Sequence, residues 1–384
     1  MSALNDRHAL IRSFTAVVLP LSFATACSTG PTDTAQPAET PTTVSPSPGD
    51  SRLFVVAGND GSTETMDVAT DGTVTVLTSA PGSVSPGIVR LADGAVAVAD
   101  SSGATVFAAD LKQIAHAEGD STGFVTHAVG SADGDTAAFA YAVGDGQHPD
   151  RHLIVTVSTD GTTFSTISNS VPVGLTQCAD GHVSWLEAAS PAPSFDGGEL
   201  GRDVAVSRIT ASGPADIRSE VLPASPAPVW GRAGCGDTAS WVSGDGTAVT
   251  VEEGAATRAT VSTFRPASEA RGKDTSEGTT ADGSIHRISA DGIVESYTFT
   301  PEPRFHSADS GPVGITGATV TGGGDVAPFV VTWDGDPSTG SFSATAFDPD
   351  DTTCTRDLGP VTLPADMTLL AATVPGETEL SCGR

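Results

Sequence analysis

Three alternating polar residues near the middle of the chain could bind a metal ion. His148, Asp150 and His152 would present two imidazoles and a carboxylate, and nitrogen and oxygen ligands of this kind suit several transition metals. The same spacing also fits a solvated hairpin tip, which is the interpretation we favour, so no metal is predicted. The three residues remain candidates for a binding site.

A second candidate segment combines an aromatic side chain with charges of both signs. Phe195, Glu199 and Arg202 have the composition that recognition surfaces often show. A polar loop with one ring packed on the body is the alternative. Further along, a basic cluster could meet an acidic ligand, although we favour a role in balancing the acidic surface; its members are Arg265, Arg271 and Lys273.

Aspartates crowded late in the chain could bind calcium, because hard oxygen ligands suit that ion. They are Asp334, Asp336, Asp348, Asp350 and Asp351. The regular D-x-D-x-D-G loop is absent, so we favour aspartates that form turns. Calcium is the one cofactor that the sequence leaves open.

Catalytic patterns give little support to an enzyme. The histidines show no pairing that implies a serine triad, and the G-x-x-x-x-G-K-[ST] nucleotide loop is absent. Tyr141 and Tyr297 lie in strand-like runs, which disfavours a tyrosine nucleophile. Paired carboxylates of the glycosidase kind stay open, because the 47 acidic residues offer too many pairs.

Composition limits the fold and the partners. The 384 residues carry 18 basic and 47 acidic side chains, and the resulting net charge of −29 makes nucleic acid a poor partner. With 43 glycines, 26 prolines and 5% aromatic residues, the chain is typical of a turn-rich all-β protein. The hydrophobic share of 38% is still enough for a folded core.

The beginning of the chain indicates export. Residues 1–26 contain a charged start and a short apolar stretch, Phe14 to Ala24, which is too short to span a bilayer. The following Ala-Thr-Ala-Cys resembles the lipobox of bacterial lipoproteins, including those of the actinobacterial type. This resemblance implies that Cys27 is lipidated, becomes the mature N-terminus and anchors the protein to the outer face of the membrane. A cleaved signal with an incidental Cys27 is the alternative.

Residues 27–50 are predicted to form the lipidated cysteine and an extended linker rich in proline, threonine and serine. The body, 51–384, then holds four cysteines. No C-x-x-C pair or Cys/His cluster has zinc-like spacing, so we expect disulfides in this exported protein. Of the three possible pairings we favour Cys178 with Cys235 and Cys354 with Cys382.

Short runs of alternating or β-branched residues recur through the body, separated by turns that contain aspartate. One such turn repeats with spacings of 40, 47, 57, 45, 43 and 41 residues, at Asp93, Asp133, Asp180, Asp237, Asp282, Asp325 and Asp366. Periods in the forties with four strands each predict a β-propeller. We count seven blades, with six or eight as alternatives, and expect residues 367–374 to complete the first blade and close the ring.

Two local patterns carry a resemblance across 51–384. The run RLFVVAGNDGSTETMDVATDGTVTVL resembles propellers of the YVTN and lactonase-like kind, and VSTDGTTF at 157–164 resembles a sialidase-type Asp-box. In those families the Asp-box is a structural turn, so the resemblance implies architecture and not catalysis. Trp185 and Trp241 follow matching cysteines in successive repeats, and we expect them to pack between blades.

The connectivity of a propeller predicts where a site would lie. Links between the first and second and between the third and fourth strands share one rim, and all other links share the opposite rim. The long insertions are expected on that second rim, at Gly144 to His152, Ser190 to Asp203, Arg265 to Thr279 and Pro301 to Gly311. Long loops on a rigid scaffold are where binding usually resides.

These features lead to three functional hypotheses. The first is a monomeric, membrane-anchored extracytoplasmic propeller that binds or scaffolds a protein or glycan of the cell envelope through its long-loop rim. The second is a propeller enzyme, hydrolase or lactonase-like, with a small extracellular substrate at the central pore. The third is a structural spacer of the envelope.

Overall fold

The computed structural model describes a set of segments between residues 51 and 375. They are 51–59, 61–82, 85–119, 124–144, 149–168, 170–188, 203–226, 230–243, 245–260, 275–279, 285–289, 293–298, 304–308, 317–321, 329–336, 338–349, 351–364 and 366–375. All belong to one compact unit, Pro46–Arg384. The leader, Cys27 and the linker lie outside them and stay predictions. Within these segments no helix has the length and hydropathy needed to cross a bilayer.

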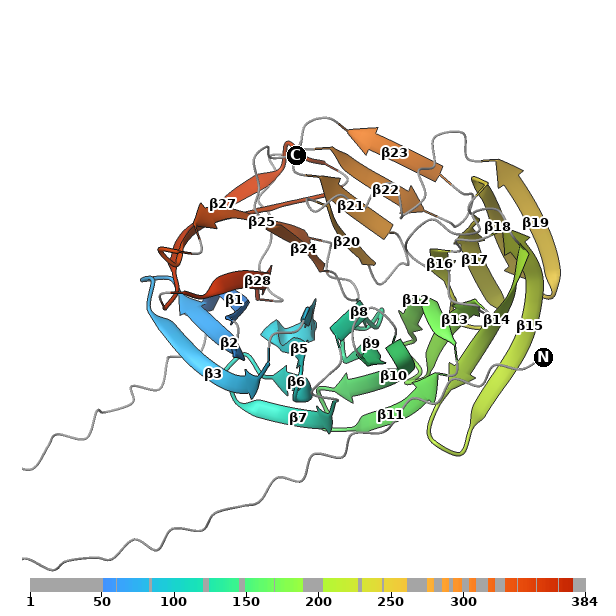
Figure 1. Cartoon of the computed structure of the whole chain (residues 1–384), viewed down its shortest axis with the longest axis horizontal. Helices are drawn as coiled ribbons and strands as arrows, with labels where there is room; N and C mark the ends of the chain where they lie inside the picture. Colours follow the sequence, from blue (N-terminus) through green and yellow to red (C-terminus); the bar gives the residue numbers. More distant parts are fainter. Residues whose placement is uncertain are drawn as a thin grey trace, which may run out of the picture. The chain divides into compact units, whose positions relative to one another are not determined.

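The described strands pair into seven four-stranded antiparallel sheets, the blades of a β-propeller (Figure 1). In each sheet the first-named strand is the innermost and the last-named the outermost. The first sheet is β28 (Thr368–Thr373), β1 (Ser51–Gly58), β2 (Ser62–Ala69) and β3 (Val74–Pro81). The second is β4 (Gly87–Arg90), β5 (Val96–Asp100), β6 (Gly103–Phe107) and β7 (Gln113–Glu118), with the 3-10 helix η1 (Ala92–Gly94) after β4. The third is β8 (Phe124–Gly130), β9 (Thr136–Gly144), β10 (Pro149–Ser158) and β11 (Thr163–Ser168).

The remaining four sheets follow the same order. The fourth is β12 (Val171–Gln177), β13 (Val183–Ala188), β14 (Asp203–Ala211) and β15 (Ile217–Pro226). The fifth is β16 (Trp230–Arg232), β17 (Thr238–Val242), β18 (Thr247–Glu252) and β19 (Ala255–Thr260). The sixth is β20 (Thr275–Thr279), β21 (Ile285–Ser289), β22 (Val294–Thr298) and β23 (Arg304–Ala308). The seventh is β24 (Gly317–Thr321), β25 (Phe329–Asp336), β26 (Ser341–Phe347) and β27 (Thr355–Thr362).

The two ends of the described chain meet in the first sheet, as expected. β28 pairs antiparallel with β1, with Val55 opposite Ala372 and Phe54 opposite Thr373. Leu369 is buried in a core that joins the first and seventh sheets, together with Leu53 and Trp333. The closing strand therefore completes a sheet whose other three strands come from the opposite end of the propeller sequence.

Small residues let innermost strands of adjacent sheets approach one another closely. A Cβ added at Gly174 of β12 would lie 2.0 Å from the carbonyl oxygen of Gly231 in β16. Because no neighbour could give way at that distance, only glycine fits where the fourth and fifth sheets meet. Gly317 of β24 is needed within its own sheet, because it pairs with Trp333 of β25 and its Cβ would fall 2.4 Å from the indole ring.

The larger side chains fill the wedges between adjacent sheets. Trp185 packs with Ala138 and Ile154 of the third sheet, and Trp241 packs with Leu186 and Leu222 of the fourth. Both tryptophans are almost completely buried. The expectation that they pack between blades is confirmed.

The aspartate turns form one rim of the propeller, which we call the turn rim, made of segments 91–95, 131–135, 158–162, 178–182 and 233–237. At Asp133 the carboxylate accepts hydrogen bonds from Ser131 Oγ at 2.5 Å and the Asp135 amide at 3.2 Å. The amide of Thr159, in the predicted Asp-box, donates to the Asp135 carbonyl at 2.9 Å. The link between the first and second strands of the third sheet and the link between its third and fourth strands therefore share this rim, as the connectivity requires.

One of the seven repeat marks is placed differently from the prediction. Asp366, with a φ of 68°, lies in the link between β27 and β28, on the opposite rim of the propeller. We call this opposite rim the loop rim. The reason is the ring closure: β28 and β1 are paired but not connected in sequence, so the first sheet has no link between its first and second strands. Asp282 and Asp325 lie outside the described residues.

The long insertions are also corrected in part. The described residues of segment 144–152 belong to strands, because β9 ends at Gly144 and β10 begins at Pro149, with Pro149 opposite Gly144. Segment 301–311 contains β23, the fourth strand of the sixth sheet. The segment begins in the link from the third strand, β22, and links of this kind lie on the turn rim. The links from β13 to β14 and from β19 to β20 join strand ends on the loop rim, as expected.

The closing strand can be tested by shortening one buried side chain. Leu369→Ala removes a buried residue from the core between the first and seventh sheets and should lower the free energy of unfolding by about 2–5 kcal/mol. Thr368→Ala, at the exposed neighbouring position, is the control and should change it by less than about 0.5 kcal/mol. Urea denaturation followed by tryptophan fluorescence measures both; equal effects would mean that β28 does not contribute to the core.

Candidate functional site

A polar cluster lies between the third and fourth sheets at the loop rim. Glu187, near the end of β13, accepts a hydrogen bond from Ser168 Oγ at 2.5 Å and another from Trp185 Nε1 at 2.9 Å, both at its Oε1 atom. Ser168 ends β11, and His152 is its partner in the neighbouring strand β10. Four polar groups from two sheets therefore meet in a wedge that is otherwise apolar.

Burial determines the charge of the His152 imidazole in this cluster. His152 is buried, and desolvation lowers the pKa of its imidazole, an effect that the nearby Glu187 carboxylate opposes only in part. The imidazole is therefore neutral at neutral pH. Glu187 is partly buried, and its Oε2 atom has no hydrogen-bond partner among the described residues. A carboxylate oxygen held in this way can accept a hydrogen bond from a ligand or pair with a positive charge.

The cluster does not have the geometry of a serine nucleophile. The Ser168 hydroxyl hydrogen bonds to Glu187 and to the carbonyl oxygen of Ser170 at 2.8 Å. Activation would require an imidazole in hydrogen-bond contact with the hydroxyl oxygen. Among the described residues, the Ser168 hydroxyl has no such imidazole contact.

The structure describes only some of the predicted binding residues. Of the alternating group, His152 is a buried strand residue rather than part of a solvated hairpin tip, and Asp150 also belongs to β10. His148 lies outside the described residues. So do Phe195, Glu199, Arg202, Arg265, Arg271 and Lys273. Glu187 and Ser168 were missed, because no local pattern links them.

The late aspartates do not converge on one calcium ion. Asp334 and Asp336 belong to β25, where they pair with Ser343 and Ser341 near the start of β26. Asp348 and Asp351 come after Phe347, which ends β26 six residues after Ser341. At about 3.3 Å per residue the two groups are separated by roughly 20 Å. Asp350 lies outside the described residues, and calcium binding by either group alone stays a prediction.

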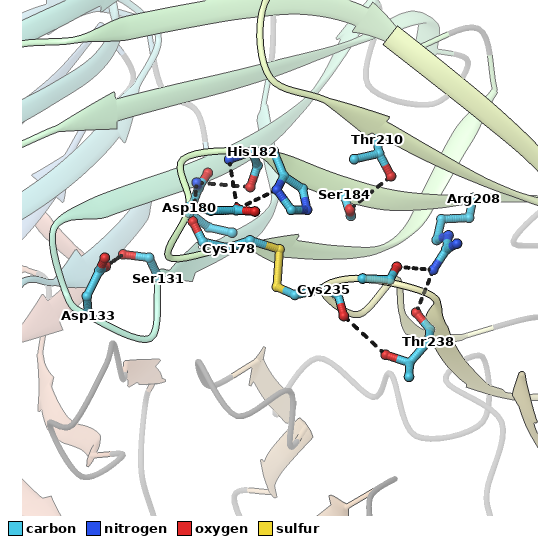
Figure 2. Close-up of a disulfide and its surroundings, with 12 residues drawn as sticks. Ser131, Asp133, Cys178, Asp180, His182, Ser184, Arg208, Thr210, Cys235 and Thr238 are labelled. Atoms are coloured by element: carbon cyan, nitrogen blue, oxygen red, sulfur yellow. Dashed lines mark hydrogen bonds and ion pairs between the residues drawn. A yellow bond between two sulfur atoms is a disulfide. The ribbon is translucent and has the colours of Figure 1, made fainter. Parts of the chain in front are cut away.

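On the turn rim, two interactions join the fourth and fifth sheets (Figure 2). Cys178 and Cys235 form a disulfide, as expected. Beside it, the Arg208 guanidinium donates to the carbonyl oxygens of Gly236 at 2.5 Å and Thr238 at 3.0 Å. Cys354 is also disulfide-bonded, and Cys382, its expected partner, lies outside the described residues.

The sequence also contains a serine motif between β7 and β8. Residues 119–123, Gly-Asp-Ser-Thr-Gly, match G-x-S-x-G. In α/β-hydrolases this motif sits between a strand and a helix. In this protein it joins β7 to β8, strands of two different sheets, so the structural context of a nucleophile elbow is missing. Ser121 itself lies outside the described residues.

Comparison with known proteins does not assign the chain to a family. No family model and no curated protein matches the chain. Among solved structures, a puromycin-hydrolyzing peptidase of Mycobacterium tuberculosis is 14% identical with a TM-score of 0.40, covering 83% of this chain and 55% of its own, so this chain spans about half of its length. AztD of Citrobacter koseri is 12% identical with a TM-score of 0.38, covering 85% and 98%. At these values the matches carry no argument about activity or ligands.

The buried imidazole predicts a pH dependence of stability. Because the folded-state pKa of His152 is below its ordinary value of about 6.5, the unfolded chain takes up a proton first, and stability is lost as the pH falls from there towards the folded pKa. His152→Gln should remove this contribution. Urea midpoints at pH 7.5 and pH 5.5 check it; a difference as large in the variant as in the parent would contradict the assignment.

Proposed function

We propose that this protein is a lipid-anchored, extracytoplasmic β-propeller that binds a protein or glycan of the cell envelope through its loop rim. The leader, the lipobox resemblance of residues 24–27 and the linker support the location. The propeller supplies a rigid body, and the loop rim is the end where the β13–β14 and β19–β20 links start and finish. Rigid scaffolds with long loops on one rim are a common arrangement for recognition.

The polar cluster around Glu187 is the observation that carries this proposal. One oxygen of the Glu187 carboxylate accepts two hydrogen bonds from neighbouring side chains, whereas the other is not among the buried unpaired atoms of the described residues and is accessible to solvent. The cluster also lies where residues 189–202 leave β13. A partner that offers a hydrogen-bond donor or a cationic group would bind this accessible oxygen of the carboxylate.

The binding role predicts that neutralising Glu187 weakens capture of the partner. Glu187→Gln removes the charge but keeps the size of the side chain, and losing a charge-assisted hydrogen bond worth about 1.5–3 kcal/mol should lower affinity about tenfold or more. Glu252→Gln is the matched control, because Glu252 is an exposed carboxylate at the other end of a strand, on the turn rim. Detergent-solubilised envelope is passed over the immobilised full chain, and retained proteins and glycans are quantified. Equal capture by both variants and the parent would reject the site.

The anchor is tested separately with Cys27→Ser in a bacterium that processes lipoproteins. The parent should partition into the detergent phase of Triton X-114, because each buried methylene of an acyl chain contributes about 0.8 kcal/mol. The variant should stay in the aqueous phase, while Ser28→Ala behaves like the parent. If the parent itself is aqueous, Cys27 is incidental and the signal is simply cleaved.

A further inference from the structure

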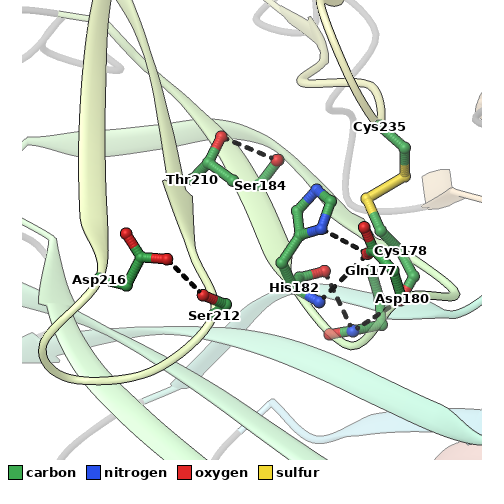
Figure 3. Close-up of polar contacts among 9 residues, drawn as sticks. All are labelled: Gln177, Cys178, Asp180, His182, Ser184, Thr210, Ser212, Asp216 and Cys235. Carbon is green, nitrogen blue, oxygen red and sulfur yellow. Dashed lines mark hydrogen bonds and ion pairs between the residues drawn. A yellow bond between two sulfur atoms is a disulfide. The ribbon is translucent and has the colours of Figure 1, made fainter.

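Three side chains with metal-binding atoms gather at the turn between β12 and β13 (Figure 3). The Sγ atom of Cys178, a carboxylate oxygen of Asp180 and a ring nitrogen of His182 all lie within 4.8 Å of one another. The Asp180 carboxylate and the His182 ring are in direct contact. The residues alternate in sequence, so the turn brings all three together at one end of the fourth sheet.

The fifth sheet brings a fourth ligand atom to the same point. The Sγ atom of Cys235 is 2.03 Å from that of Cys178 in the disulfide, and the two Cα atoms are 5.8 Å apart. Two cysteines, one histidine and one aspartate are a chemically suitable set for tetrahedral zinc, whose bonds to thiolate sulfur are about 2.3 Å long. While the disulfide is intact, neither sulfur can bind metal as a thiolate.

We propose that reduction of the Cys178–Cys235 disulfide creates a four-ligand zinc site made of Cys178, Cys235, His182 and Asp180. A dithiol reductant supplies two electrons and two protons, the bond between the sulfurs breaks, and the reductant becomes a disulfide. Zinc then replaces the two thiol protons, which are released to solvent. This site does not depend on the function proposed for the loop rim.

The surrounding hydrogen bonds hold the ligands in place without the disulfide. In the fourth sheet, the amide of Cys178 donates to the His182 carbonyl at 2.9 Å, and Gln177 Nε2 donates to the carbonyls of both residues at 3.2 Å. In the fifth sheet, Arg208 binds the carbonyls of Gly236 and Thr238, which follow Cys235. Both turns therefore stay positioned when the sulfurs separate.

The site is also open to an ion from solvent. The side chain of Asp180 is 67% exposed and that of His182 is 18% exposed, whereas Cys178 is buried beneath them. The ligand set carries three negative charges when both thiols are ionised, which exceeds the charge of a zinc ion by one. Zinc binding would replace the covalent link between the fourth and fifth sheets with a coordinate one.

Cobalt is the probe, because tetrahedral cobalt bound to thiolate gives strong visible bands and a near-ultraviolet charge-transfer band. The full chain carries Cys27→Ser, Cys354→Ser and Cys382→Ser, so that Cys178 and Cys235 are its only cysteines. It is reduced with dithiothreitol, freed of reductant under nitrogen and titrated with cobalt, then with zinc. We expect one cobalt per chain with both bands, full displacement by zinc, and no such bands in the oxidised protein.

Ligand variants separate the proposed site from binding by two thiolates alone. His182→Ala and Asp180→Asn should each weaken cobalt binding at least tenfold, whereas Asp133→Asn, in the equivalent turn of the third sheet, should titrate like the parent. Failure of both ligand variants to weaken binding, or reduced protein that gives no charge-transfer band, would overturn the proposal.

A second measurement covers the case in which the cysteine substitutions prevent folding. The chain with all its cysteines is compared with Cys178→Ser/Cys235→Ser after identical reduction, with circular dichroism to confirm folding. The site requires that the charge-transfer band present in the first is lost in the second. An equal band in both would place the bound metal elsewhere and reject the site.

Discussion

The pairing of β28 with β1 is the constraint on which the rest of the propeller depends. Without it β1 would be an exposed sheet edge, and the core shared by the first and seventh sheets would lose Leu369 and Ala372. Contacts on both sides hold the closing strand: the Ala372 amide donates to Thr319 Oγ1 of β24 at 3.1 Å, and Arg90 of β4 donates to the carbonyl of Pro375 at 3.2 Å. Arg90 is completely buried at this joint, and this burial lowers the pKa of its guanidinium to about 9.

The strands were largely predictable because their signals are local. Alternating apolar residues and turns that contain aspartate predict a body of short antiparallel strands, and residues 367–374 were expected to close the ring where β28 is observed. The repeat marks were less reliable. Asp366 resembles the other turns in sequence but occupies a link between sheets, because a turn-forming aspartate is compatible with either rim.

The candidate site could not be predicted in the same way, because strand register and packing between sheets create it. Glu187 and Ser168 lie on different sheets, and nothing in their neighbouring residues marks them as partners. His152 looked like a loop residue, yet β10 extends past it and buries it. The aspartates around β26 show the reverse: they are close in sequence, but a straight strand separates them in space.

The two rims of the fourth sheet can act independently. On the turn rim, Arg208 and the disulfide both connect it to the fifth sheet, while the core around Trp241 fills the wedge beneath them. Loss of the disulfide leaves the hydrogen bonds of the Arg208 guanidinium and the core around Trp241 in place. The fourth and fifth sheets should therefore stay packed together. Glu187 faces the third sheet at the other end of β13, where its position is fixed by Ser168 and Trp185. A redox or metal event at the turn rim should therefore leave binding at the loop rim unchanged.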